Sequence, residues 1–195
     1  MKIQVIVGST RPARVTDRLA KWVVNELNKT EGTEAELVDL ADYSMPFLDE
    51  PISPQYNPDR KPNPGAKKWL DKLDEADGFV IVTPEYNRAV SGVLKNAIDY
   101  IDFQFAKKPV AIAAHGSSGG AQAVANLRMM IPGLQAVTTP NVLFYVGRVG
   151  EGINENGEPS EELVARPYGP QNALTALVGN LLWYAEALKA ARDKK

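Results

Sequence analysis

The chain has 195 residues, of which 44% are hydrophobic and 24% are charged, a composition typical of a globular protein that excludes a mainly disordered chain. Lys and Arg number 22 against 24 Asp and Glu, so the formal net charge is −2, which argues against nucleic-acid binding through bulk positive charge. At roughly 150 residues per domain, the length predicts a single domain over residues 1–195.

The chain has no cysteine and a single histidine, His115. Thiol nucleophiles, thiolate metal ligands and disulfides are therefore excluded, and a Ser-His-Asp hydrolase or a multi-histidine metal site would depend on His115 alone. We expect no metal site. The sequence contains no apolar run of the ~18 residues that a membrane span requires, and it does not start with a basic head and an apolar stretch. These observations predict a soluble, cytoplasmic protein.

The first third of the chain alternates apolar and amphipathic segments. Residues 3–7 are rich in β-branched side chains and predict a strand. Apolar residues recur at helical spacing over residues 17–29 and predict a helix, and residues 34–40 predict a second strand. Six prolines between residues 43 and 64 indicate a long loop, and residues 65–74 are expected to form a short helix.

The alternation continues through the second half. Residues 79–83 predict a third strand that ends at a proline, which cannot donate a hydrogen bond to a central ladder. Residues 92–103 predict a helix and residues 109–114 a fourth strand, followed by a glycine-rich turn and a helix to about residue 131. Residues 142–146 predict the fifth strand.

The chain closes with an acidic loop over residues 148–170 and a long helix over residues 171–192. Strands that alternate with helices predict βαβ units and a parallel sheet, with helices on both faces because the crossovers are right-handed. Five strands are too few for an eight-stranded barrel. We therefore predict a flavodoxin-like α/β three-layer sandwich with a five-stranded parallel sheet in the order 2-1-3-4-5. Ligands of such sheets bind at the carboxyl ends of the strands, so the loops after strands one, three and four are the candidate site.

The loop after the first strand combines hydroxyl and cationic side chains at the start of a helix: Ser9, Arg11, Arg14 and Thr16. The unpaired N–H groups and the positive dipole end of a helix start favour a phosphate. The loop lacks both the glycine-lysine-serine/threonine ending of a P-loop and the G-x-G-x-x-G pattern, so it favours the terminal phosphate of a mononucleotide over a dinucleotide. The alternative is a surface turn with solvated arginines, in which Thr16 is a helix cap.

The other two loops are less specific on their own. Tyr86 can lie beside a flat ring and Asn87 can bind its polar edge, while Glu85 is an alternative general acid or base. A proline-bounded structural turn explains the same residues equally well. The glycines of residues 116–120 let backbone N–H groups approach a ligand, or they simply permit a tight turn in which His115 is an ordinary residue.

Taken together, these segments resemble the NADPH-dependent FMN reductase family, over roughly residues 2–146. The resemblance lies in Gly8-Ser9-Thr10-Arg11, Ala76-Asp77-Gly78, Thr83-Pro84-Glu85-Tyr86-Asn87, Gly92-Val93-Leu94-Lys95-Asn96-Ala97-Ile98-Asp99-Tyr100, residues 116–120 and Leu127-Arg128. It implies that FMN is bound, with its phosphate on Ser9, Arg11, Arg14, Val15 and Thr16. It implies isoalloxazine contacts from Pro84, Glu85, Tyr86 and Asn87, and contacts to the other edge of the flavin from His115, Ser117, Gly119 and Gly120.

The resemblance further implies an enzyme that passes hydride from NADPH or NADH to flavin N5 and then electrons to a small-molecule acceptor, by a ping-pong mechanism. A flavin, a quinone, an azo compound or a metal oxyanion is each an open possibility for the acceptor. Family members are homodimers or homotetramers, so the helix over residues 92–103 either packs within one subunit or is shared with a partner; no nucleic-acid or membrane partner is expected. Two alternatives remain: an electron-transfer or regulatory flavoprotein without its own NAD(P)H reaction, and a nucleotide-binding hydrolase or transferase on the same fold.

Overall fold

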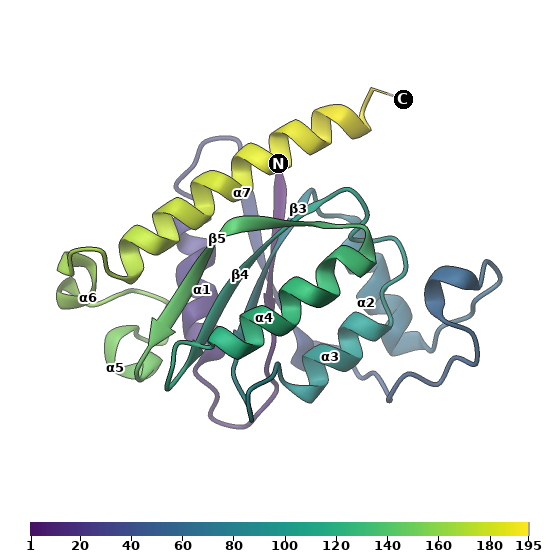
Figure 1. The fold of residues 1–195 in the computed structure, drawn as a ribbon, viewed down its shortest axis with the longest axis horizontal. Coiled ribbons are helices and arrows are strands. Elements are labelled where there is room, and N and C mark those ends of the chain that lie inside the picture. Colours follow the sequence, from purple (N-terminus) through teal and green to yellow (C-terminus); the bar gives the residue numbers. More distant parts are fainter. Residues whose placement is uncertain (195) are drawn as a thin grey trace.

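The computed structural model describes residues 1–194, and these contain one sheet of five parallel strands in the order β2-β1-β3-β4-β5 (Figure 1). The flavodoxin-like order predicted from the sequence is confirmed. The strands are β1 (Lys2–Val7), β2 (Glu34–Asp39), β3 (Gly78–Pro84), β4 (Pro109–Gly116) and β5 (Val137–Val146).

Helices cover both faces of the sheet. They are α1 (Thr16–Leu27), α2 (Pro64–Asp74), α3 (Gly92–Asp99), α4 (Ala121–Met130), α5 (Val149–Gly152), α6 (Glu161–Ala165) and α7 (Pro170–Arg192). One core cluster joins α2, α3 and α4 to one face of the sheet, with Trp69 and Phe79 fully buried. The second cluster joins α1 and α7 to the other face, around Trp22 and Leu177. Among residues 1–194, no helix is both long and apolar enough to cross a membrane.

Two of the predicted boundaries are wrong for reasons that lie far away in the sequence. The predicted helix over residues 92–103 ends at Asp99, because the Arg60 guanidinium donates hydrogen bonds to the Tyr100 carbonyl at 3.0 Å and to the Asp102 carboxylate at 2.7 Å. The fifth strand begins at Val137 instead of residue 142. Its register against β4 shifts between the pairs Val110–Thr138 and Ile112–Val142. This irregularity on an edge strand accommodates Pro140, which cannot donate to a ladder.

The acidic segment over residues 148–170 is also more ordered than a loop, because it contains α5 and α6. Helix α6 begins at a serine cap, where the Ser160 hydroxyl accepts a hydrogen bond from the N–H of Leu163. The side chain of Arg18 on α1 donates to the carbonyl of Ile153 at 3.5 Å, so this segment packs beside the start of α1. The long loop over residues 43–64 extends from the body on the right of Figure 1.

Candidate active site

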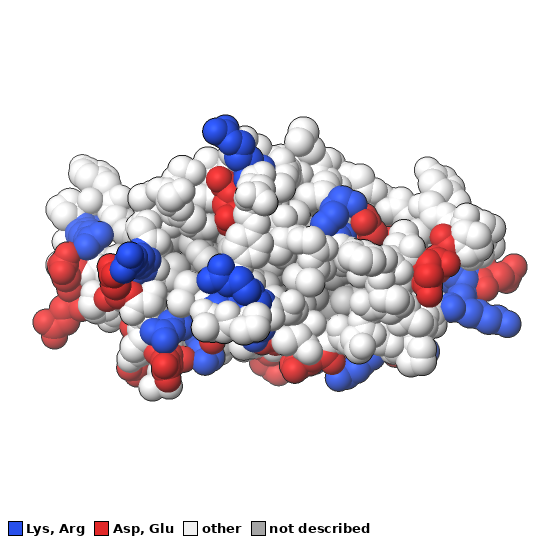
Figure 2. All heavy atoms as spheres, turned by 90° about the horizontal axis from the view of Figure 1, so that it is seen from below, with Lys and Arg blue, Asp and Glu red and all other residues white. Residues whose placement is uncertain are grey.

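The loops after β1, β3 and β4 meet at the edge of the sheet where the strands end. The N–H of Gly8 donates to the carbonyl of Val82 at 2.8 Å, and the hydroxyl of Ser91 donates to the carbonyl of Gly8 at 2.5 Å. The N–H of Glu85 donates to the carbonyl of His115 at 2.9 Å. A Cβ on Gly8 would lie 2.8 Å from the Val82 carbonyl oxygen, so only glycine permits this close approach. Figure 2 views the molecule from this edge and shows Lys and Arg side chains spread across the face, most of them beside an acidic side chain.

The start of α1 has free backbone donors. Val15 is its N-cap residue and makes no side-chain capping bond. The first N–H groups of a helix that lacks such a cap are open to an anion, and the helix dipole favours negative charge there. Ser9 and Thr16 lie beside this turn, and both are 1% exposed. Ser9 also accepts a 3.4 Å hydrogen bond from the N–H of Arg11.

The two arginines of this loop point in different directions. Arg11 is exposed, and its guanidinium carbon lies 5.9 Å from the centre of the Tyr86 ring. Arg14 instead pairs with Asp39 at the end of β2. Arg11 makes no ion pair with another of residues 1–194 and can meet an anion at the start of α1, whereas the charge of Arg14 is already balanced.

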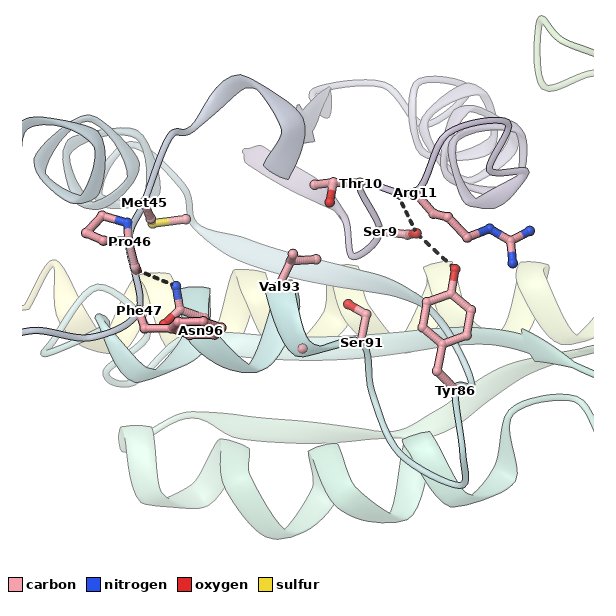
Figure 3. Close-up of a pocket in the computed structure, with 11 residues that line it drawn as sticks. Ser9, Thr10, Arg11, Met45, Pro46, Phe47, Tyr86, Ser91, Val93 and Asn96 are labelled. Carbon is pink, nitrogen blue, oxygen red and sulfur yellow. Dashed lines mark hydrogen bonds between the residues drawn. The ribbon is translucent and has the colours of Figure 1, made fainter.

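Tyr86 lies on a tight hairpin after β3. The N–H and carbonyl of Tyr86 pair with those of Ala89 at 2.9 and 3.0 Å, and both intervening residues, Asn87 and Arg88, have positive φ angles of 49° and 64°. Two left-handed residues in succession are typical of a type I′ turn. The turn directs the Tyr86 ring back across the site, where its hydroxyl lies 3.2 Å from that of Ser9 (Figure 3). Asn87 is exposed at the tip of the turn.

A cavity of about 550 Å³ opens between these loops, within the range of small-molecule sites. Ser9, Arg11 and Tyr86 line one side of it. Its other side is built by residues that sequence reasoning missed (Figure 3): Met45, Pro46, Phe47, Val93 and Asn96.

The wall around Phe47 is held by side chains of α3 and its end. The Asn96 amide donates to the carbonyl of Pro46 at 2.7 Å and accepts from the N–H of Leu48 at 3.0 Å. The Tyr100 hydroxyl lies 3.3 Å from the carbonyl of Pro46 and from that of Phe47. These contacts fix the backbone on both sides of Phe47, whose side chain is 85% exposed at the cavity. The only signal in the sequence is that a long loop leaves the sheet at the edge where ligands bind.

Several predicted flavin contacts, at the end of β3 and in the loop after β4, lie outside the lining of this cavity. Pro84 ends β3 opposite His115 in the ladder. The Glu85 carboxylate accepts from the N–H groups of Gln122 at 2.8 Å and Ala123 at 3.3 Å, so it caps the start of α4. That contact explains the side chain without a general acid or base role.

The glycine turn after β4 is tightly packed. Ser117 is exposed at its tip, and Gly119 and Gly120 have positive φ angles of 74° and 83°. A Cβ on Gly120 would lie 2.6 Å from that of Ala114, and one on Gly119 would lie 3.2 Å from that of Phe144. The glycines therefore serve the turn itself, and their contacts with a flavin stay a prediction.

His115 connects the end of β4 to the start of α1. Its Nε2 lies 2.9 Å from the hydroxyl oxygen of Thr16. Burial and, to a smaller extent, the positive charge of Arg11 lower the pKa of His115 to about 4, so the imidazole is neutral at pH 7. Within the described residues, no three His, Asp or Glu side chains lie close enough to hold a metal ion.

Comparison with known proteins places this geometry in a family. The sequence profile described as NADPH-dependent FMN reductase matches residues 1–151. An NAD(P)H-dependent FMN reductase of Schizosaccharomyces pombe is 36% identical over 161 residues, covering 78% of this chain and 80% of the relative. An FMN-dependent NADPH-azoreductase of Staphylococcus haemolyticus is 33% identical, covering 72% of this chain and 74% of the relative.

Solved structures show the same architecture. FerB from Paracoccus denitrificans, a flavoenzyme NAD(P)H:(acceptor) oxidoreductase, superposes with a TM-score of 0.68 at 22% identity over 97% of each chain. That identity supports the fold alone, whereas the profile match over residues 1–151 includes the loops described above. The chain belongs to the NADPH-dependent FMN reductase family.

Proposed function

We propose that this protein is an FMN-dependent NAD(P)H oxidoreductase that reduces a small-molecule acceptor. The observation that carries the proposal is the uncapped start of α1 together with the loop that precedes it, whose Ser9 and Arg11 line a cavity of about 550 Å³ with Tyr86. Free helix N–H groups, buried hydroxyls and an unpaired guanidinium match a phosphate, and an aromatic wall matches a flat ring. The names of the relatives support the same cofactor and donor.

The residues present fit FMN. The first turn of α1, with Ser9, Thr16 and Arg11, would hold the phosphate, while residues 84–87 and the glycine turn at residues 116–120 would hold the isoalloxazine. Arg14 is a weaker candidate for a phosphate contact than Arg11, because its guanidinium is already paired with the Asp39 carboxylate. When bound, FMN supplies the chemistry by accepting hydride from the nicotinamide and returning electrons to the acceptor.

The chain's own residues bind and orient the reactants. Glu85 is engaged at the start of α4 and His115 with Thr16, so the site offers no free acid–base pair, and the proposed reaction needs none. Both reactants would use the cavity beside Phe47 and Tyr86 in turn. We therefore propose a ping-pong sequence, for which initial rates at several acceptor concentrations would give parallel double-reciprocal lines.

The acceptor class rests on the relatives and on the wall of the cavity. Azoreductases are among the relatives, and an exposed phenylalanine such as Phe47 stabilises an aromatic acceptor by stacking. We propose an aromatic acceptor, an azo compound or a quinone, in preference to a metal oxyanion. A higher kcat/KM for chromate than for an azo dye or a quinone would refute this choice.

We also propose a homodimer. Exposed apolar side chains occur on and around α3 and α4: Phe47, Tyr56, Val93, Phe103 and Met129. A surface with several large exposed apolar side chains is typical of a protein interface. Sedimentation analysis of the wild type and of a Met129→Glu, Phe103→Glu double variant tests this, and a monomeric wild type would refute it.

The function is tested by the visible absorbance of the purified protein with FMN, before and after anaerobic NADPH. Retained flavin that NADPH bleaches, together with steady-state NADPH oxidation when only a small-molecule acceptor is added, supports the proposal. Retained flavin without NADPH oxidation would favour an electron-transfer or regulatory flavoprotein. A protein that binds no flavin would refute the assignment and favour a nucleotide-binding hydrolase or transferase.

A further inference from the structure

Thr16 occupies a position where the direction of one hydrogen bond decides what its hydroxyl can bind. It is the first residue of α1 and 1% exposed, and its hydroxyl oxygen lies 2.9 Å from Nε2 of His115. A hydroxyl has one proton to donate and two lone pairs that accept. If Thr16 donates its proton to His115, only lone pairs remain toward the free N–H groups of α1, and lone pairs repel an anion.

The opposite direction makes the site complete. If Nε2 of His115 carries the proton and donates to Thr16, the Thr16 hydroxyl can donate onward to an oxygen of an anion. A β-branched side chain has few χ1 rotamers, which keeps the hydroxyl oxygen in place, while its proton can rotate toward the anion. The carbonyl of His115 accepts the N–H of Glu85 at 2.9 Å, which fixes the backbone that carries the ring.

We propose that His115 is a positioning residue for the anion site of α1: its Nε2–H donates to Thr16, so that the Thr16 hydroxyl donates to the terminal phosphate of the cofactor. The inference rests on the proposed function and goes further in assigning His115 to the phosphate, where the sequence suggested a contact with the flavin ring. His115 acts through Thr16, as a neutral dipole.

The lowered pKa of His115 is consistent with this role. A neutral imidazole has one N–H and one bare nitrogen, so the bond to Thr16 selects a single tautomer. The groups around the ring are the Thr16 hydroxyl at the start of α1 and the guanidinium of Arg11 on the loop between β1 and α1. Burial is the larger cause of the lowered pKa, and the positive charge of Arg11 adds to it, so that His115 stays neutral.

The test compares two ligands that differ only in the phosphate. Dissociation constants of FMN and riboflavin are measured by flavin fluorescence with the flavin-free wild type and with His115→Leu, His115→Gln and Thr16→Val. A hydrogen bond to a charged group is worth enough to change affinity roughly tenfold. We expect His115→Leu and Thr16→Val each to weaken FMN binding about tenfold and to leave riboflavin binding within about twofold. His115→Gln keeps an N–H donor and should retain most of the FMN affinity.

Two further readouts separate positioning from packing. In the double variant His115→Leu, Thr16→Val, the losses should not add, because both remove the same chain of hydrogen bonds. The ¹⁵N spectrum of the single histidine should show a protonated Nε2 in the FMN complex. Equal weakening of FMN and riboflavin, full additivity, or a bare Nε2 would overturn the inference while leaving the function intact. A wild type that binds neither ligand would refute the proposed function and, with it, this inference.

Discussion

The single histidine makes the stability of this protein depend on pH in a way that can be isolated. Burial disfavours the charged imidazolium and lowers the pKa of His115 from its ordinary value of about 6.5 to about 4. Between these two values the unfolded chain binds a proton at His115 that the folded chain does not bind. Stability conferred by the neutral ring is therefore fully present above about pH 6.5 and is lost as the pH falls toward 4.

The size of the effect follows from the shift. Each pKa unit corresponds to 1.36 kcal/mol, so the folded state loses about 3 kcal/mol in total and about 2 kcal/mol by pH 5. The His115→Gln variant keeps a polar side chain at this position but does not titrate. Urea denaturation of both flavin-free proteins at pH 7 and pH 5 therefore removes the contribution of the carboxylates that they share.

We expect the wild type to lose about 2 kcal/mol more than His115→Gln between these two pH values. In addition, ¹³C-labelled histidine should give one titrating signal with a midpoint near pH 4. If the two proteins lose stability in parallel to within about 0.5 kcal/mol, or if the histidine titrates near its ordinary value of about 6.5, the reasoning about burial is wrong.

Three further predictions concern residues that hold the loops around the site in place. Replacing Arg60, whose side chain is 8% exposed, with methionine leaves the carboxylates of Glu50 and Asp102 without their partner, and it should lower the free energy of unfolding in urea by about 3–5 kcal/mol. The control Lys67→Met, which removes an exposed ion pair, should lower it by less than about 1 kcal/mol. Equal losses in the two variants would contradict this prediction. Asn96→Ala removes the two hydrogen bonds that this side chain makes to the backbone of Pro46 and Leu48, and it should speed limited proteolysis near residue 47. An unchanged cleavage rate would show that the wall does not need these two bonds. Gly120→Ala should lower the free energy of unfolding by about 1–3 kcal/mol, because the new Cβ would lie 2.6 Å from that of Ala114 on a residue with a left-handed φ. The control Gly133→Ala should be tolerated, because a Cβ there would meet no other atom within 4 Å. Equal melting temperatures of the two variants would refute the packing argument.

The contacts that hold the loops around the site show the limit of what local sequence patterns can predict. Arg60 lies 40 residues before Tyr100, whose carbonyl accepts its hydrogen bond at the end of α3. Nothing within the pattern of residues 92–103 therefore indicated that the helix would end at Asp99. Similarly, the partner of Arg14 is 25 residues away, on β2, and that pairing weakens its predicted phosphate role. Asn96 and Pro46 are 50 residues apart, and no periodicity links a helix residue to a loop of this length.

The sequence by itself determined the sheet, its strand order and the position of the loop that is predicted to bind a phosphate. These follow from local information: five apolar runs separated by amphipathic segments, and a hydroxyl- and arginine-rich turn between a strand and a helix. Only the tertiary structure decided which side chains remain free to bind. Glu85 is used at the start of α4, whereas Arg11 and the first turn of α1 stay open, and Phe47 joins the cavity from a distant loop. The physical reason is that a hydrogen bond or ion pair depends on distance in space, which side chains far apart in the chain reach only after the sheet has brought their loops together.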